Sequence, residues 1–248
     1  MATGLAAALA LTLGQTAMAE GLVSTLSDDA VQITSSFTGE RIVVFGAVQA
    51  PTGDPEEYQI AVVVEGPQQD VTVRRKGRVM GVWANVDARS FSSVPSFYVM
   101  HLSPWFLDRI DMEGFLQYRL GVKALPFVQA ASVEQVSGRF AEALISLKTG
   151  QGLYDERRDE VTFVAPGVFR STFFLPSAVP TGDYKVSVYL FRGAAFLAGQ
   201  SQTLTVAKGG FSERIARTAQ EHSLLYGLAC VAMAVLTGWL AGIIFRRN

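Results

Sequence analysis

The stretch Val179-Pro180-Thr181-Gly182-Asp183-Tyr184-Lys185-Val186 is the most specific indication of a fold in this sequence. The order Pro-x-Gly-x-Tyr-x-Val is common in immunoglobulin-like β-sandwiches. There the glycine permits a tight turn before a strand, and the tyrosine hydroxyl reaches a nearby backbone group. Because this arrangement belongs to the scaffold, it predicts a fold and says nothing about activity.

Short runs rich in Val, Ile, Phe and Tyr lie on both sides of this stretch, and Gly or Pro separates many of them. Runs of this length and spacing predict an antiparallel β-sandwich. The predicted strands are residues 31–37, 41–48, 58–64, 71–73, 79–86, 97–102, 115–122, 161–164, 168–175, 184–191 and 195–206.

One helix interrupts the predicted strands. Val136, Phe140, Leu144 and Leu147 share a face at helical spacing, so we expect a helix at about 133–149 that packs on a sheet. The fold class is therefore mainly β, with one or two immunoglobulin-like sandwich units and one inserted helix. We place a first unit at 20–125 and a second, smaller one at 126–206. Whether the two units share one core is open from the sequence.

The C-terminal segment predicts a membrane anchor. Residues 223–245 contain no charged side chain, and 23 helical residues reach about 34 Å, enough to cross a bilayer. Arg246 and Arg247 follow, which by the positive-inside rule makes 246–248 a cytoplasmic tail. Residues 207–222 are a polar juxtamembrane segment. The alternative reading of 223–245 is a buried helix of a soluble protein.

The N-terminal segment predicts export. Residues 5–13 are apolar, and Ala17-Met18-Ala19 follows as an A-x-A cleavage site, so we expect a signal peptide at 1–19. The first four residues contain no Lys or Arg, which departs from the usual pattern. The alternative is an uncleaved N-terminal membrane helix.

Small residues recur every four positions along the predicted anchor: Cys230, Ala234, Gly238 and Gly242. Such a face lets a second membrane helix approach closely. The partners expected are therefore the lipid bilayer and, through this face, either an integral membrane protein or a second copy of this chain. The alternative is that the pattern has no function, since Gly and Ala are common in membrane helices.

Composition and motifs argue against several classes of function. Residues 20–222 hold 19 basic and 22 acidic residues, a net charge of −3 that argues against nucleic-acid binding. The single cysteine, Cys230, lies in the anchor. The common nucleophile, phosphate-binding and metal-binding motifs are absent from the sequence, and its two histidines, His101 and His222, are far apart. We therefore expect no catalytic residue, no cofactor and no metal site.

Two surfaces are candidates for binding. We interpret Lys76-Gly77 as the tip of a hairpin. This tip presents four cations to an anionic ligand, headgroup or acidic partner: Arg74, Arg75, Lys76 and Arg78. The alternative is a solvated hairpin that prevents edge-to-edge pairing. Trp105 and Phe106 follow Pro104 in a connection and are candidates for a partner contact, although most aromatic residues of this region should be core.

Several stretches together resemble a family of alphaproteobacterial proteins described as "putative transmembrane protein" and of unknown function. They are Val73-Arg74-Arg75-Lys76, Gly81-Val82-Trp83, Val94-Pro95-Ser96-Phe97-Tyr98, Val188-Tyr189-Leu190-Phe191-Arg192, Leu225-Tyr226-Gly227-Leu228, Gly238-Trp239-Leu240-Ala241 and Phe245-Arg246-Arg247. The resemblance implies a single-pass protein of the Gram-negative inner membrane with its body in the periplasm. It supplies no catalytic residues.

These observations predict a non-enzymatic accessory or assembly subunit of an inner-membrane complex or transporter. A hypothesis of another class is a periplasmic ligand-binding or sensor domain that recognises an anion or a glycan at the cationic hairpin. A pocket beside Arg74, Arg75, Lys76 and Arg78 would favour the second hypothesis.

Overall fold

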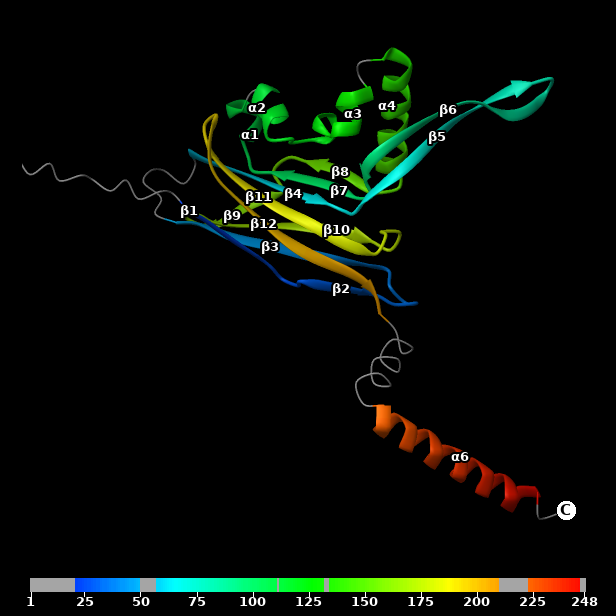
Figure 1. Ribbon diagram of the computed structural model, residues 1–248. Coiled ribbons are helices and arrows are strands. Elements are labelled where there is room, and N and C mark those ends of the chain that lie inside the picture. Colours follow the sequence, from blue (N-terminus) through cyan, green and yellow to red (C-terminus); the bar gives the residue numbers. More distant parts are fainter. Residues whose placement is uncertain (1–20, 50–56, 111, 132–133, 210–222, 246–248) are drawn as a thin grey trace, which may run out of the picture.

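The computed structural model describes residues 21–49, 57–110, 112–131, 134–209 and 223–245. The predicted signal peptide, residues 210–222 of the predicted juxtamembrane segment and the predicted tail lie outside these residues. The body is mainly β, as the sequence predicts, and consists of two packed sheets, a group of short helices and one long hairpin (Figure 1).

The first sheet has four antiparallel strands in the order β1-β3-β10-β9. Their bounds are β1 Gly21–Leu26, β3 Gly39–Gln49, β9 Val161–Ala165 and β10 Val168–Pro176. Burial alternates strictly along β10, where Phe169, Ser171, Phe173 and Leu175 point inward. This alternation is the pattern of a strand with one face on a core and the other in solvent.

The second sheet has six strands in the order β2-β12-β11-β4-β7-β8. Their bounds are β2 Ala30–Ile33, β4 Tyr58–Glu65, β7 Tyr98–Leu102, β8 Tyr154–Arg157, β11 Gly182–Arg192 and β12 Ala195–Lys208. The pairs β2–β12 and β7–β8 are parallel and the other pairs are antiparallel. Nearly every residue of β4 and all of β7 are buried, so both faces of these strands are covered.

Short helices between β7 and β8 cover the outer face of the second sheet (Figure 1). They are α1 Phe106–Arg109, α2 Met112–Gln117, the 3-10 turn η2 Val122–Ala124, α3 Pro126–Ala131 and α4 Gln135–Gly150. The helix predicted at 133–149 is thus confirmed as α4, but its predicted packing face is only half right: Phe140 and Leu144 are buried, whereas Val136 and Leu147 are exposed. The strand predicted at 115–122 is wrong, because this short apolar run forms α2 and η2. Short runs do not distinguish strand from helix.

The two predicted units share both sheets. Strands β3 and β4 of the first unit pair directly with β10 and β11 of the second. Buried side chains from both units form one hydrophobic cluster. The predicted boundary near residue 125 therefore does not separate two cores. The sequence left this question open, and the structure shows that both predicted units share one hydrophobic core.

The turn before β11 has the geometry predicted from its sequence. The Tyr184 hydroxyl donates a 2.6 Å hydrogen bond to the Pro180 carbonyl oxygen, and the tyrosine is fully buried. Burial raises the Tyr184 pKa to about 12. Gly182 has φ +145°, and a Cβ there would lie 2.9 Å from Pro67 Cγ, so a side chain is excluded. This turn fixes where β11 enters the second sheet.

A polar contact joins the two sheets inside the core. His101 Nδ1 on β7 lies 2.8 Å from Ser171 Oγ on β10, and both residues are buried. Burial lowers the His101 pKa from its usual 6.5, because the charged imidazolium is poorly solvated there, although Glu160 and Asp155 partly oppose this shift. The histidine is thus a core residue with a satisfied ring nitrogen.

The segment predicted as the anchor forms the helix α6, Ser223–Phe245, which has the predicted bounds. Counting only the residues that the structure describes, no helix combines the length and the apolarity needed to cross a membrane.

The hydrogen bond of Tyr184 should contribute measurably to stability. We expect Tyr184→Phe to lower the free energy of unfolding by about 1–2 kcal/mol, because the Pro180 carbonyl loses its donor. Urea denaturation followed by circular dichroism measures this change. Tyr189→Phe on the same strand is the matched control and should change stability by less than about 0.5 kcal/mol. Equal losses would contradict the assignment.

Burial of His101 predicts a pH-dependent stability. Below about pH 6.5 the unfolded chain takes up a proton on this ring that the folded chain resists. The free energy of unfolding should therefore fall as the pH decreases from 6.5, by at most about 1.4 kcal/mol per pH unit. Denaturation curves of the wild type and His101→Gln between pH 4.5 and 7.5 isolate this contribution. Parallel pH profiles for the two proteins would argue against it.

Candidate functional site

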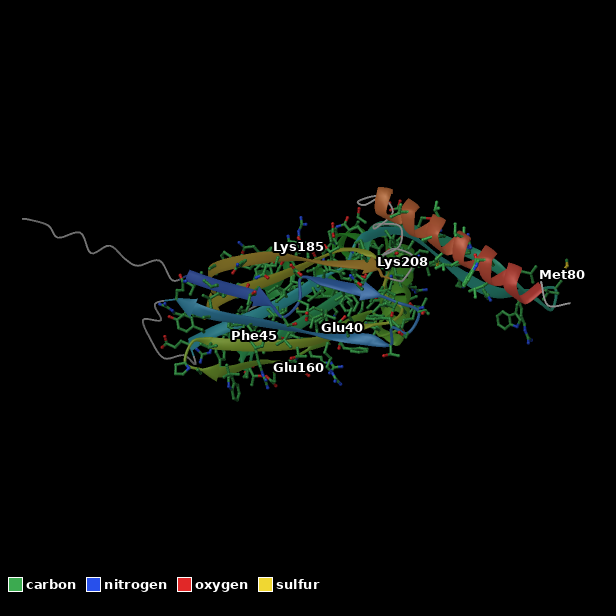
Figure 2. All side chains as sticks on the ribbon, turned by 90° about the horizontal axis from the view of Figure 1, so that it is seen from below. Glu40, Phe45, Met80, Glu160, Lys185 and Lys208 are labelled. Carbon is green, nitrogen blue, oxygen red and sulfur yellow. The ribbon has the colours of Figure 1, made fainter. Side chains whose placement is uncertain are left out.

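The strands β5, Gln68–Val79, and β6, Val82–Pro95, form a separate two-stranded antiparallel ribbon, called the arm below. It extends beyond the sandwich and the helices (Figure 1). Strands of this length span about 40 Å at roughly 3.3 Å per residue. In Figure 2 Met80 marks the outermost point of the arm, well away from Phe45 and Glu40 of the sandwich.

The base of the arm is fixed to the body. Phe91 is buried and packs edge-on against Phe127 of α3, with ring centroids 5.9 Å apart. Where β6 ends, the Tyr154 hydroxyl donates to the Pro95 carbonyl oxygen at 2.7 Å, and Lys148 Nζ of α4 donates to the Ser96 carbonyl oxygen at 3.2 Å. These contacts determine the direction in which the arm leaves the body.

Lys148 is an unusual residue for this position. It is only 7% exposed, its ammonium lies 5.9 Å from the Tyr154 ring centroid, and burial lowers its pKa. Among the described residues, the hydrogen-bond acceptor of this ammonium is an uncharged carbonyl group, and burying a cation without an anionic partner costs free energy of folding. Lys148 therefore holds the arm base but lowers the stability of the fold.

The tip of the arm is the two-residue turn Met80-Gly81. Both residues have positive φ, 51° and 83°, as a type I′ hairpin turn requires. The predicted tip at Lys76-Gly77 is therefore wrong. Gly77 lies inside β5 opposite Ala84, and a Cβ there would lie 2.9 Å from Val86, so this glycine makes room for a neighbour rather than a turn.

The distal arm, residues 74–88, has two different faces because side chains alternate along a strand. Arg74, Lys76 and Arg78 share one face, and Trp83, opposite Arg78, joins them. The guanidinium carbon of Arg78 lies 5.4 Å from the Trp83 ring centroid, a cation–π contact.

The other face of the distal arm is largely apolar. Val79 and Val82 form the last pair before the turn, and Val86 packs over Gly77. Arg75 also lies on this face, opposite Asp87. Asp87 instead pairs with Arg89, at 3.0 Å.

The distal arm is positively charged and exposed. Among the described residues, none of Arg74, Arg75, Lys76 and Arg78 forms an ion pair. The apolar tip is exposed as well: Met80 is 100%, Val82 69% and Trp83 63% exposed. Uncovered apolar side chains next to uncompensated cations mark a contact surface. The cations predicted from the sequence thus belong to a larger surface whose apolar members the prediction missed.

Of the second predicted surface, which consists of Trp105 and Phe106, only one residue is exposed. Trp105 is 71% exposed, but Phe106 is 1% exposed and packs edge-on against Phe115 and Phe191. Phe106 as a partner-binding residue is therefore wrong, because its ring fills the core. Trp105 precedes Phe106, which packs on Phe191 near the end of β11. The arm leaves the body beside the beginning of β11, so Trp105 and the arm lie at opposite ends of the second sheet.

The predicted packing face of α6 is open to a neighbour. Cys230, Ala234, Gly238 and Gly242 follow at four-residue steps along this helix, and all four are exposed. A Cβ added at Gly238 or Gly242 would meet no described atom within 4 Å outside the adjacent backbone of the helix itself. Among the described residues, no group of three or more His, Cys, Asp or Glu side chains could hold a metal ion.

The alternation of residues 68–95 was the signal that could have revealed the whole arm. Val71, Val73 and Val79 alternate on β5, and Val82 begins a second run after Met80-Gly81, whose alternation shifts by one residue at the bulge before Asp87. The sequence Arg75-Lys76-Gly77 indicated a turn at Lys76-Gly77, but the observed pairing of β5 with β6 excludes a turn at this position.

The two ends of the arm should respond differently to truncation. Phe91→Ala at the base should lower the free energy of unfolding by about 3 kcal/mol, since it opens a cavity against Phe127. Trp83→Ala at the tip should change it by less than about 0.5 kcal/mol. Urea denaturation of both variants checks this. A large loss for Trp83→Ala would show that the tip is covered by the body.

Comparison with known proteins identifies a family. A search of curated proteins finds none that matches this chain. A family model, in contrast, matches residues 21–247, which include the whole sandwich, the arm and α6. The resemblance identified from the sequence is therefore confirmed: the chain belongs to the family described as "Putative transmembrane protein (Alph_Pro_TM)".

Proposed function

We propose that this chain is a membrane-anchored, non-enzymatic accessory or assembly subunit of an inner-membrane complex or transporter, and that the distal arm is its partner-binding element. The observation that carries the proposal is the arm itself. A long ribbon fixed at its base exposes Met80, Val82 and Trp83 beside cations that form no ion pair with any described residue, and the body gains nothing from their exposure.

Membrane anchoring is supported by the family and by the sequence of α6. Residues 223–245 lack charged side chains, and Arg246 and Arg247 follow them. In this proposal α6 crosses the inner membrane once, the tail is cytoplasmic, and the signal peptide at 1–19 exports the body to the periplasm. The small-residue face of α6 then packs against a membrane helix of the partner or of a second copy.

The strand order supports an immunoglobulin-like body. β1-β3-β10-β9 corresponds to the order A-B-E-D, and β12-β11-β4-β7 to G-F-C-C′. Tyr184 forms its corner hydrogen bond at the start of β11, the strand that corresponds to F. Sandwiches of this type present loops and edges around a rigid core, which suits a binding module better than an enzyme.

The position of the arm base supports a partner at the membrane. Lys185 of β11 pairs with Glu65 at the end of β4, just before the arm, and Gly182 pairs with Val206, near the end of β12. The chain continues from β12 towards α6. The arm and the connection to α6 therefore leave the same end of the sandwich, where an integral membrane partner could engage both.

The alternative, an anion- or glycan-binding sensor at the same cations, has less support. Such a site needs a concavity that desolvates its ligand. Three cavities in the described body are lined by other parts of the chain, and none includes a residue of the arm. A projecting ribbon suits insertion into a groove of a larger partner.

In-cell photocrosslinking of the full-length protein tests this proposal. A photoreactive amino acid at Trp83 should crosslink one defined integral membrane protein. The same amino acid at Arg170, an exposed residue of β10 in the other sheet, is the control and should not.

Charge reversal and anchor variants complete the experiment. Arg74→Glu/Lys76→Glu/Arg78→Glu should abolish the crosslink from position 83 while the protein stays folded. Gly238→Leu/Gly242→Leu should weaken it if α6 also contacts the partner. A pattern of crosslinks that is the same from positions 83 and 170, or that survives the triple reversal, would exclude the arm as the binding element.

A further inference from the structure

A second feature lies among the helices that cover the six-stranded sheet. A cavity of about 550 Å³, called the cap cavity, opens between β7, the end of β8 and the segment that holds α1, α2 and η2. Its volume lies within the range of small-molecule sites, about 300–1,000 Å³. It is lined by Met100, Leu102, Leu107, Ile110, Phe115, Leu116, Leu120, Gly121, Lys123, Ala124, Glu156, Arg157 and Arg158.

The wall of the cap cavity is apolar. Met100 and Leu102 of β7 and Ile110 after α1 are buried side chains at its floor. Leu116 of α2 is 45% exposed and forms part of the rim. An apolar concavity of this size is poorly solvated by water, which finds few hydrogen-bond partners on such a wall. The wall therefore favours a hydrocarbon ligand.

One side of the cavity is held rigidly. The Gly121 amide donates to the Tyr98 hydroxyl at 2.8 Å, and the Val122 amide donates to Glu156 Oε1 at 2.6 Å. Burial raises the Tyr98 pKa far above its usual value, so this hydroxyl stays protonated. Gly121 has φ +86°, and a Cβ there would lie 3.1 Å from Glu156 Oε1. The backbone at the cavity edge is thus preorganised rather than dependent on a ligand.

The charged groups at the edge are mostly cationic. Arg157 is paired with Asp155 at 2.7 Å and with Glu160 at 3.4 Å. Glu156, the carboxylate of the lining, accepts the Val122 amide. Lys123 and Arg158 are exposed and have no ion-pair partner among the described residues. An anionic headgroup would find two available cations there.

We infer that the cap cavity binds a long-chain fatty carboxylate, with its hydrocarbon chain against Met100, Leu102 and Leu116 and its carboxylate between Lys123 and Arg158. Charge complementarity at the edge and apolarity of the wall together select this class. A neutral alcohol of the same length would use the wall alone. The inference does not depend on the partner proposed for the arm, because the two surfaces share no residue.

Photolabelling of the full-length protein in phosphatidylcholine nanodiscs tests this site. The probes are palmitic acid and palmityl alcohol, each carrying a diazirine on its chain, and labelled peptides are mapped by mass spectrometry. We expect the acid to label peptides within residues 100–124. Lys123→Glu/Arg158→Glu should reduce this labelling about tenfold and leave labelling by the alcohol unchanged.

Two further variants complete the test. Leu116→Glu places a carboxylate on the rim and should also reduce labelling by the acid. Arg170→Glu, a charge reversal on β10 of the other sheet, should have no effect. Labelling confined to α6, which reports lipid partitioning, would overturn the inference. Labelling by the acid that is insensitive to reversal of Lys123 and Arg158 would overturn it as well.

Discussion

The position of β11 is the constraint on which the rest of the structure depends. This strand pairs along its whole length with β12 on one side and, from Lys185 to Arg192, with β4 on the other. At its start, Tyr184 is tied to Pro180 and Gly182 lies against Pro67, just before the arm. At its end, Phe191 packs on Phe106 and so supports the helices of the cap. β11 thereby sets the distance between the arm and the short helices that line the cap cavity.

The arm shows how an isolated ribbon can be kept in a single orientation. A two-stranded hairpin is marginally stable in water by itself. Here Phe91 and the carbonyl groups of Pro95 and Ser96 are held by the body, and Met80-Gly81 supplies a turn whose twist matches the strands. The residues between these ends need no contact with the core, so their side chains are available for another molecule.

Local signals in the sequence were sufficient for some elements. The strands β4, β10 and β11, the helix α4 and the corner at Tyr184 follow from periodicity and turn chemistry, because each is specified by residues close in sequence. The shared core could not be predicted this way, since β3–β10 and β4–β11 join segments more than a hundred residues apart. The inward ring of Phe106 and the cap cavity depend on the same long-range packing. Of the candidate site, the cations were predictable, whereas their arrangement required the register between β5 and β6.

The parallel pair formed by β2 and β12 has a consequence for the order of folding. Ala30 and Val31, near the beginning of the body, pair with Thr205 and Val206 at its end, and the preceding strand β1 belongs to the opposite sheet. The first strands therefore cannot find all their neighbours until almost the entire body has been synthesised. Contacts between residues so distant in sequence slow folding, because a long loop must close before they form. The closing strand, β12, is also the last described strand before α6, so the sandwich is completed only when synthesis has almost reached the C-terminal helix.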